Sequence, residues 1–119
     1  MTDQNDNIII VSEAISKIEL KDIAVKRFGD MVKAVIDLDK TLMALGGELH
    51  ADEEAVLLSN GSEQRNLWGI NIYPDKDMPE MVEFDSMINI RPSQNNRSRS
   101  VEDENIQKKI IEVVIKLIK

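Results

Sequence analysis

The chain has 119 residues, a formal net charge of −7 and no cysteine. A chain of this length is typical of one domain, and it can bury enough surface to fold without disulfides or a metal. The lack of cysteine excludes disulfides, thiolate zinc sites, iron–sulfur clusters and cysteine nucleophiles. The negative net charge opposes binding to nucleic acid and to anionic lipid.

The apolar runs and the first residues of the sequence indicate the cellular location of the protein. No apolar run approaches the ~20 residues that a membrane-spanning helix requires. Residues 1–7 are acidic and polar, whereas a secretory signal begins with basic residues. We therefore expect a cytoplasmic protein without a membrane partner, in which residues 1–7 form a disordered leader and residues 8–119 form a single domain.

The N-terminal part of the domain predicts one strand and one helix. Residues 8–11 are a β-branched run, which is typical of a short strand. Ser16 and Glu19 have the spacing of a capping box, in which a hydroxyl precedes a carboxylate by three positions. Gly29 is a typical residue for a helix end, so we predict a helix over residues 17–28.

The segment 31–48 fits two structures. Apolar and polar residues alternate from Val32 to Leu38, which favours a strand. Apolar residues also recur at helical spacing over 30–45, so a single helix ended by the glycines that follow is the alternative. We predict a β-hairpin, with strands at about 31–38 and 42–48.

The remaining elements complete the predicted fold. Acidic residues at the start of the segment 51–60 lie where a helix dipole favours negative charge, which indicates a short helix. Alternation predicts strands over 67–73 and 81–90. Residues 103–118 place their apolar side chains on one helical stripe. The sum is an α+β fold: a four- or five-stranded, mainly antiparallel sheet with helices on one face.

Four blocks of the sequence resemble a family of small, uncharacterised prokaryotic proteins. They are Phe28–Val35 (FGDMVKAV), Gly46–Glu54 (GGELHADEE), Leu67–Asn71 (LWGIN) and Phe84–Pro92 (FDSMINIRP). These blocks are spread over most of the predicted domain. The family carries only a domain-of-unknown-function label, so the resemblance implies kinship and assigns no activity, substrate or residue role.

His50 is the only histidine, and it lies next to the predicted start of the helix 51–60. A histidine in that place is a candidate catalytic general base, because its ordinary pKa is about 6.5. Gly46 and Gly47 precede it and permit close approach of a ligand to the backbone. The alternative is structural: the glycines form a strand bulge and His50 caps the helix.

Four carboxylates lie close to His50 in the sequence: Glu48, Asp52, Glu53 and Glu54. Carboxylate oxygens are ligands for Mg²⁺ and Mn²⁺. Adjacent helical residues, however, point about 100° apart, so the three consecutive acids cannot meet one ion. We therefore expect no metal site and attribute these three acids to the helix dipole. Glu48 is retained as a predicted ligand-binding residue.

A basic segment precedes the last predicted helix. Arg91, Arg97 and Arg99 lie in a polar stretch, residues 91–100, that contains no acidic residue. Planar guanidinium groups suit phosphate and carboxylate, and a helix N-terminus adds to such a site. We predict an anion-binding site made of Arg91, Asn96, Arg97, Ser98 and Arg99. The alternative is a solvated loop whose arginines pair with carboxylates elsewhere on the surface.

Two aromatic residues, Trp68 and Tyr73, belong to the strand predicted over 67–73. They could stack a base or a ring. Alternation places them on opposite faces, however, so we predict that Trp68 packs in the core. Polar positions of the two C-terminal strands are predicted to share one cleft, with Asn71 as its ligand-binding residue; they are Asn71, Asp85, Ser86 and Asn89.

These patterns support one main hypothesis for function. It is a dimeric cytoplasmic binding domain for an anionic small molecule or a protein partner, with no cofactor, because no nucleotide fingerprint, P-loop or zinc motif is present. One alternative is a small hydrolase or phosphodiester-acting enzyme, with His50 as base and the arginines stabilising negative charge. Another is a structural module that binds other proteins. The sequence leaves open whether the chain is an enzyme.

Overall fold

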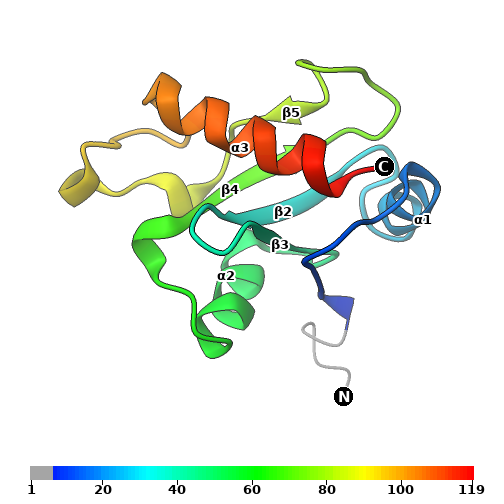
Figure 1. The fold of residues 1–119 in the computed structure, drawn as a ribbon, viewed down its shortest axis with the longest axis horizontal. Coiled ribbons are helices and arrows are strands. Elements are labelled where there is room, and N and C mark those ends of the chain that lie inside the picture. The colour runs from blue at the N-terminus through cyan, green and yellow to red at the C-terminus, as the bar shows by residue number, and fades with distance from the viewer. Residues whose placement is uncertain (1–6) are drawn as a thin grey trace.

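The structure is a computed structural model that describes residues 7–119, so the leader expected over 1–7 lies outside the described residues apart from Asn7. Within them, five strands form one antiparallel sheet in the order β1-β3-β2-β4-β5 (Figure 1). The predicted α+β fold is confirmed. The strands are β1 (Ile9–Val11), β2 (Val32–Asp37), β3 (Leu42–Leu45), β4 (Leu67–Ile72) and β5 (Val82–Glu83). The α-helices are α1 (Lys17–Arg27), α2 (His50–Ser59) and α3 (Glu104–Leu117). The short 3₁₀ helices are η2 (Gln64–Asn66), η3 (Met87–Asn89) and η4 (Pro92–Gln94).

The hairpin predicted within 31–48 is confirmed, and the helical alternative is wrong. β2 and β3 are antiparallel neighbours. The Asp37 carboxylate closes the turn between them, because its Oδ1 accepts from the backbone N–H groups of Asp39 and Lys40, each at 2.9 Å. Thr41 completes the turn with a left-handed φ of 54°. An Asx turn of this kind explains why the chain reverses here instead of continuing as a helix.

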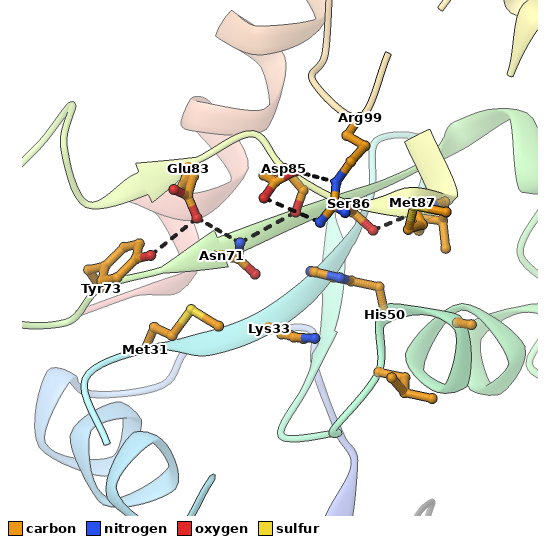
Figure 2. Close-up of a pocket in the computed structure, with 13 residues that line it drawn as sticks. Met31, Lys33, His50, Asn71, Tyr73, Glu83, Asp85, Ser86, Met87 and Arg99 are labelled. Atoms are coloured by element: carbon orange, nitrogen blue, oxygen red, sulfur yellow. Dashed lines mark hydrogen bonds and ion pairs between the residues drawn. The ribbon is translucent and has the colours of Figure 1, made fainter. Parts of the chain in front are cut away.

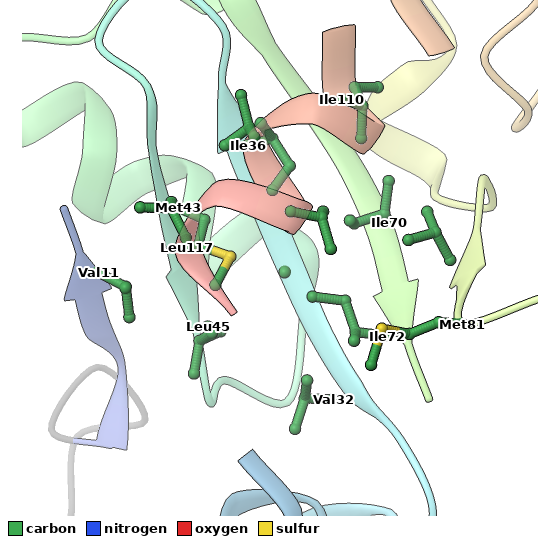
Figure 3. Close-up of a cluster of buried hydrophobic side chains, with 14 of the residues drawn as sticks. Val11, Val32, Ile36, Met43, Leu45, Ile70, Ile72, Met81, Ile110 and Leu117 are labelled. Carbon is green, nitrogen blue, oxygen red and sulfur yellow. The ribbon is translucent and has the colours of Figure 1, made fainter. Parts of the chain in front are cut away.

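The first face of the sheet is covered by α1 and α3. Leu20 and Ala24 of α1 and Ile110 and Leu117 of α3 are buried against it, so the apolar stripe predicted for the last helix is confirmed. Ser16 caps α1 as predicted, since its Oγ accepts from the Glu19 N–H at 3.1 Å. Figure 3 shows this larger cluster, whose strand residues include Val11, Val32, Ile36, Met43, Leu45, Ile70 and Ile72.

The second face is covered by α2. Val35 of β2 and Leu67 of β4 pack there against Leu57 of the helix. The helices therefore occupy both faces, whereas the sequence indicated helices on one. β2 explains the difference, because its residues from Ala34 to Asp37 are buried on both sides. A strand that is apolar on both faces needs cover on both.

The strand predicted over 81–90 is wrong beyond Glu83, where β5 ends. Beyond it, side chains take the place of a paired strand along β4. The Asn89 Oδ1 accepts from the Gly69 N–H at 2.8 Å, and its Nδ2 donates to the Gly69 carbonyl at 2.9 Å. The Arg91 guanidinium donates to the Leu67 carbonyl. The backbone groups of Gly69 and Leu67 on this edge of β4 are thus paired with an amide and a guanidinium. The backbone of the segment after Glu83 therefore does not pair with β4.

Gly69 allows the segment after Glu83 to pass over the second face. A Cβ at this position would lie 2.6 Å from the Ser86 Cβ, so only glycine permits Ser86 to rest on β4. Phe84 packs on the first-face cluster, whereas Ile88 packs on the second-face cluster. The alternation from 81 to 90 therefore did not mark one buried strand face.

We expect Ile110→Asp to lower the free energy of unfolding by about 4 kcal/mol or more. Truncating a buried isoleucine costs about 2–5 kcal/mol, and an unpaired buried charge adds to that cost. The matched control is Ile115→Asp on the same helix, because Ile115 is 57% exposed and Ile110 is fully buried. Urea unfolding measures both variants. Equal stability of the two would show that α3 does not pack on the sheet.

Candidate functional site

A cavity of about 380 Å³ opens on the second face of the sheet, between the start of α2 and the segment that follows β5. Its volume falls within the range of about 300–1,000 Å³ that is typical of small-molecule sites. Polar side chains from distant parts of the chain converge on it, as Figure 2 shows; they include Lys33, His50, Asn71, Glu83, Asp85 and Arg99.

The N-terminus of α2 forms one wall of the cavity and has no side-chain cap. Leu49 occupies the N-cap position, where polar side chains normally accept from the first backbone N–H groups. In residues 7–119, no group accepts a hydrogen bond from the N–H of His50 or Ala51. Leu49, His50 and Ala51 all line the cavity. The positive end of a helix dipole is therefore open to it.

Lys33 supplies a positive charge beside this wall. Its Nζ lies 5.1 Å from the centre of the Phe28 ring. No carboxylate of the described residues lies within ion-pair distance of it. Lys33 is thus a cation that lines the cavity and has no anionic partner in the described part of the chain.

His50 is buried and held in one orientation. Its Nε2 lies 2.8 Å from the Ile70 carbonyl oxygen. Because a carbonyl oxygen can only accept, Nε2 carries the hydrogen and Nδ1 of the neutral ring is the acceptor. Burial lowers the pKa of His50 below 6.5; the hydrogen bond to Ile70 opposes this shift, and the charge of Lys33 reinforces it. The ring is therefore neutral at pH 7, with its Nδ1 lone pair unused by any described residue.

Asn71 and Glu83 form the opposite side of the cavity. The Asn71 Nδ2 donates to the Glu83 Oε1 at 2.8 Å and to the Asp85 carbonyl at 3.3 Å. The Tyr73 hydroxyl donates to the same Glu83 oxygen at 3.1 Å. The Asn71 Oδ1 is buried and accepts from no described residue. The network orients the amide and leaves one acceptor without a donor.

Arg99 is anchored at the rim of the cavity. Its guanidinium forms an ion pair with Asp85, with Nε and Oδ1 2.7 Å apart. Its backbone carbonyl accepts from the Ser86 N–H and from the Asn89 Nδ2, both at 3.0 Å. The segments around residues 86 and 99, which are distant in sequence, are therefore fixed side by side.

Three predicted site residues, His50, Asn71 and Arg99, line the cavity. Arg91 does not: its terminal nitrogens donate to the carbonyls of Gln64 and Leu67, and its guanidinium lies over the Trp68 ring, 4.2 Å from the centroid. Trp68 is 2% exposed and belongs to the first-face cluster, so the prediction of core packing is confirmed.

The other predicted binding residues also lie outside the cavity. Asn96 is buried, and its Nδ2 donates to the carbonyls of Asn89 and Ser100, both at 2.7 Å. Ser98 also lies outside the cavity: its side chain donates to the Glu102 carboxylate, and this hydrogen bond lowers the pKa of Glu102. Arg97 is exposed, and Glu48 forms an ion pair with Arg27 at 2.9 Å. The three predicted arginines therefore do not converge on one anion.

Lys33 and Glu83 are cavity residues that the sequence did not single out. Alternation in β2 placed Lys33 on the face opposite Val32 and Ala34, which was a signal for a polar surface position. The strand register brings it next to Asn71, and the short pairing of β5 brings Glu83 to the other side of that residue. Neither pairing could be derived from spacing along the chain.

Glu53 is fully buried near the cavity without lining it. Its Oε2 accepts from the Gly47 N–H at 3.0 Å, and its Oε1 has no partner among the described residues. Burial raises the pKa of Glu53 well above 4.5, although the Gly47 hydrogen bond and the charge of Lys33 oppose the shift. Within residues 7–119, no three His, Asp or Glu side chains are placed to hold a metal ion.

We expect Glu53→Gln to flatten the pH dependence of stability. Because the folded-state pKa is raised, the stabilising contribution of Glu53 is present below pH 4.5 and is lost as the pH rises through the folded pKa. The loss reaches about 1.4 kcal/mol per pH unit at most. Urea unfolding from pH 4.5 upward tests this against Glu104→Gln, which also removes a first-turn helix acid but from an exposed site. Identical pH profiles of the parent and Glu53→Gln would contradict the expectation.

Comparison with known proteins adds a family but no activity. No helix in the described part of the chain is long and apolar enough to cross a membrane. No curated protein and no solved structure matches the chain. Residues 9–117 match a family described as "Protein of unknown function (DUF5674)", and this range includes every residue that lines the cavity. The predicted kinship with a family of unknown function is thus confirmed, and the chain belongs to the DUF5674 family.

Proposed function

We propose that this protein binds a small molecule through an anionic group, a carboxylate or a phosphate, in the cavity between α2 and β4. The observation that carries the proposal is the start of α2, where the first N–H groups and Lys33 have no hydrogen-bond or ion-pair partner within residues 7–119 and all line the cavity. A helix N-terminus carries about half a positive charge and binds anions through its N–H groups. Lys33 adds a full charge at the same wall.

The arrangement of the other cations supports an anion at this wall. Arg99 lines the cavity but is already paired with Asp85, so it contributes little net charge. His50 is neutral because burial lowers its pKa, and it supplies no charge at pH 7. Lys33 is therefore the residue whose charge a bound anion would neutralise, and Arg99 provides N–H donors at the rim.

We expect Lys33→Met to weaken anion binding about tenfold or more, because a charge-assisted hydrogen bond contributes about 1.5–3 kcal/mol. Thermal shifts with acetate, inorganic phosphate and a panel of carboxylate and phosphate metabolites identify a binding anion in the parent. Titration calorimetry then compares affinities between the parent and the variant. Added salt should weaken binding to the parent.

The matched control is Lys116→Met, which makes the same change in charge and side chain on the exposed surface of α3. This variant should bind the anion as the parent does. An equal loss of affinity in the two variants would mean that the net charge of the protein causes the loss, and it would contradict a site at Lys33. Failure of every anion to bind the parent would refute the proposed function.

A second candidate function is hydrolysis with His50 as general base, and one observation favours it. The bond from Nε2 to Ile70 fixes the ring and leaves Nδ1 as an unused acceptor at the cavity wall. A base must be neutral at the working pH, and burial provides this by lowering the pKa of His50. The α2 N–H groups would then stabilise developing negative charge.

For this second candidate we expect slow turnover of p-nitrophenyl acetate or bis(p-nitrophenyl) phosphate by the parent. The rate should fall with decreasing pH, with a midpoint below 6.5, since the pKa of His50 is lowered. General-base catalysis contributes about 10²–10⁴-fold, so His50→Ala should lose at least a hundredfold in rate and still bind anions. Undiminished turnover in a folded His50→Ala protein would eliminate His50 as the base.

A further inference from the structure

Lys33, Asn71 and Glu83 form one row across three neighbouring strands. Lys33 is the cross-strand partner of Asn71, and Asn71 is the cross-strand partner of Glu83, so the three side chains share one face and line the cavity (Figure 2). Strands in a sheet lie about 4.8 Å apart, which separates the outer two backbones by about 10 Å. The row carries a positive charge at one end, a negative charge at the other and an amide between them.

The amide in the middle of the row lacks a donor. Both groups that the Asn71 Nδ2 contacts, the Glu83 carboxylate and the Asp85 carbonyl, can only accept, so the orientation of the amide is determined. Its Oδ1 points away from Glu83 into the site in Figure 2. Asn71 is 5% exposed, and no described residue donates to this oxygen. A buried acceptor without a donor is costly, so a bound N–H group is its natural partner.

The carboxylate at the end of the row lacks a cation. Glu83 accepts only from the neutral groups of Asn71 and Tyr73, and no Lys or Arg among residues 7–119 lies within ion-pair distance of it. Asp85, by contrast, is paired with Arg99. As far as residues 7–119 are concerned, the cavity thus has a cation without an ion pair, Lys33, and an anion without an ion pair, Glu83, on opposite sides.

The charges that line the cavity indicate which charged groups a ligand should carry. Among the described residues, a simple anion would pair with Lys33 but leave the Asn71 Oδ1 without a donor and Glu83 without a cation. A ligand that carries a carboxylate and an ammonium group complements all three, because the carboxylate pairs with Lys33 while the ammonium donates to the Asn71 Oδ1 and adds positive charge near Glu83. The rim adds an apolar surface, since two of its side chains, Leu49 and Met87, are 51% and 64% exposed.

We propose that the ligand is a zwitterion of the amino-acid type with an apolar side chain. Its carboxylate lies at Lys33 and the start of α2, its ammonium group donates to the Asn71 Oδ1 within the field of the Glu83 carboxylate, and its side chain lies on Leu49 and Met87. This inference rests on the proposed function, because the carboxylate is the anion of that site.

The test compares amino acids with analogues that lack one charge. Leucine, isoleucine, valine, methionine and phenylalanine are screened by thermal shift, and the one with the largest shift is titrated by calorimetry. For leucine, the analogues are 4-methylpentanoate, which lacks the amine, and 3-methylbutylamine, which lacks the carboxylate. We expect the amino acid to bind the parent at least about tenfold more tightly than either analogue, since each lost charged contact has an effect of this order.

Glu83→Gln tests the ammonium side without disturbing the fold, because Glu83 is exposed and glutamine still accepts from Asn71. In this variant the preference for the amino acid over its deaminated analogue should fall to about twofold or less, while the analogue itself binds as it does to the parent. The matched control is Glu80→Gln, an exposed glutamate outside the cavity. It should keep the full preference.

The outcomes separate this inference from the proposed function. If the deaminated acid binds the parent as tightly as the amino acid does, the zwitterion is refuted and anion binding stands. If neither the amino acids nor their deaminated acids bind, while inorganic phosphate does, the inference also fails alone. If no anion of any kind binds, both fail. An amino-acid preference that is unchanged in Glu83→Gln would overturn the assignment of the ammonium group to Glu83.

Discussion

Two hydrogen bonds between the Asn89 side chain and the backbone of Gly69 determine the shape of the whole second face. They satisfy an edge of β4 that β5 pairs with only at Asn71 and Ile72. Because the Asn89 amide pairs with the Gly69 backbone, the backbone after β5 can cross over the sheet. The missing Cβ of Gly69 leaves room for Ser86 on β4. That crossing segment becomes a wall of the cavity.

The opposite wall depends on a contrast among the helices. Ser16 caps α1 and Asp103 caps α3, each with a side-chain oxygen that accepts from first-turn N–H groups. The N-cap of α2 is Leu49, which has no such oxygen, and the start of this helix lines the cavity. A cap residue contributes about 1 kcal/mol of stability. Its absence here exposes the helix dipole where a ligand can reach it, which is consistent with the proposed binding site.

Burial shapes the electrostatics of this region by shifting the pKa values of two ionisable groups towards their neutral forms. It lowers the pKa of His50 and raises the pKa of Glu53, and the charge of Lys33 acts on both. Because its pKa lies below 6.5, His50 is neutral at pH 7 and does not repel Lys33. In the described chain, neither the ammonium group of Lys33 nor the carboxylate of Glu83 on the other side of Asn71 forms an ion pair.

The sequence by itself determined the local elements. Alternation and helical stripes depend on neighbours in the chain, so the hairpin, the three α-helices and the strand around Trp68 could be predicted. It also pointed to His50, Asn71 and Arg99. Only the tertiary structure decided that Arg91 and Asn96 serve the fold, because their partners lie on other segments. It likewise decided that Lys33 joins Asn71 and Glu83, since strand register depends on contacts between distant segments and not on the order of residues.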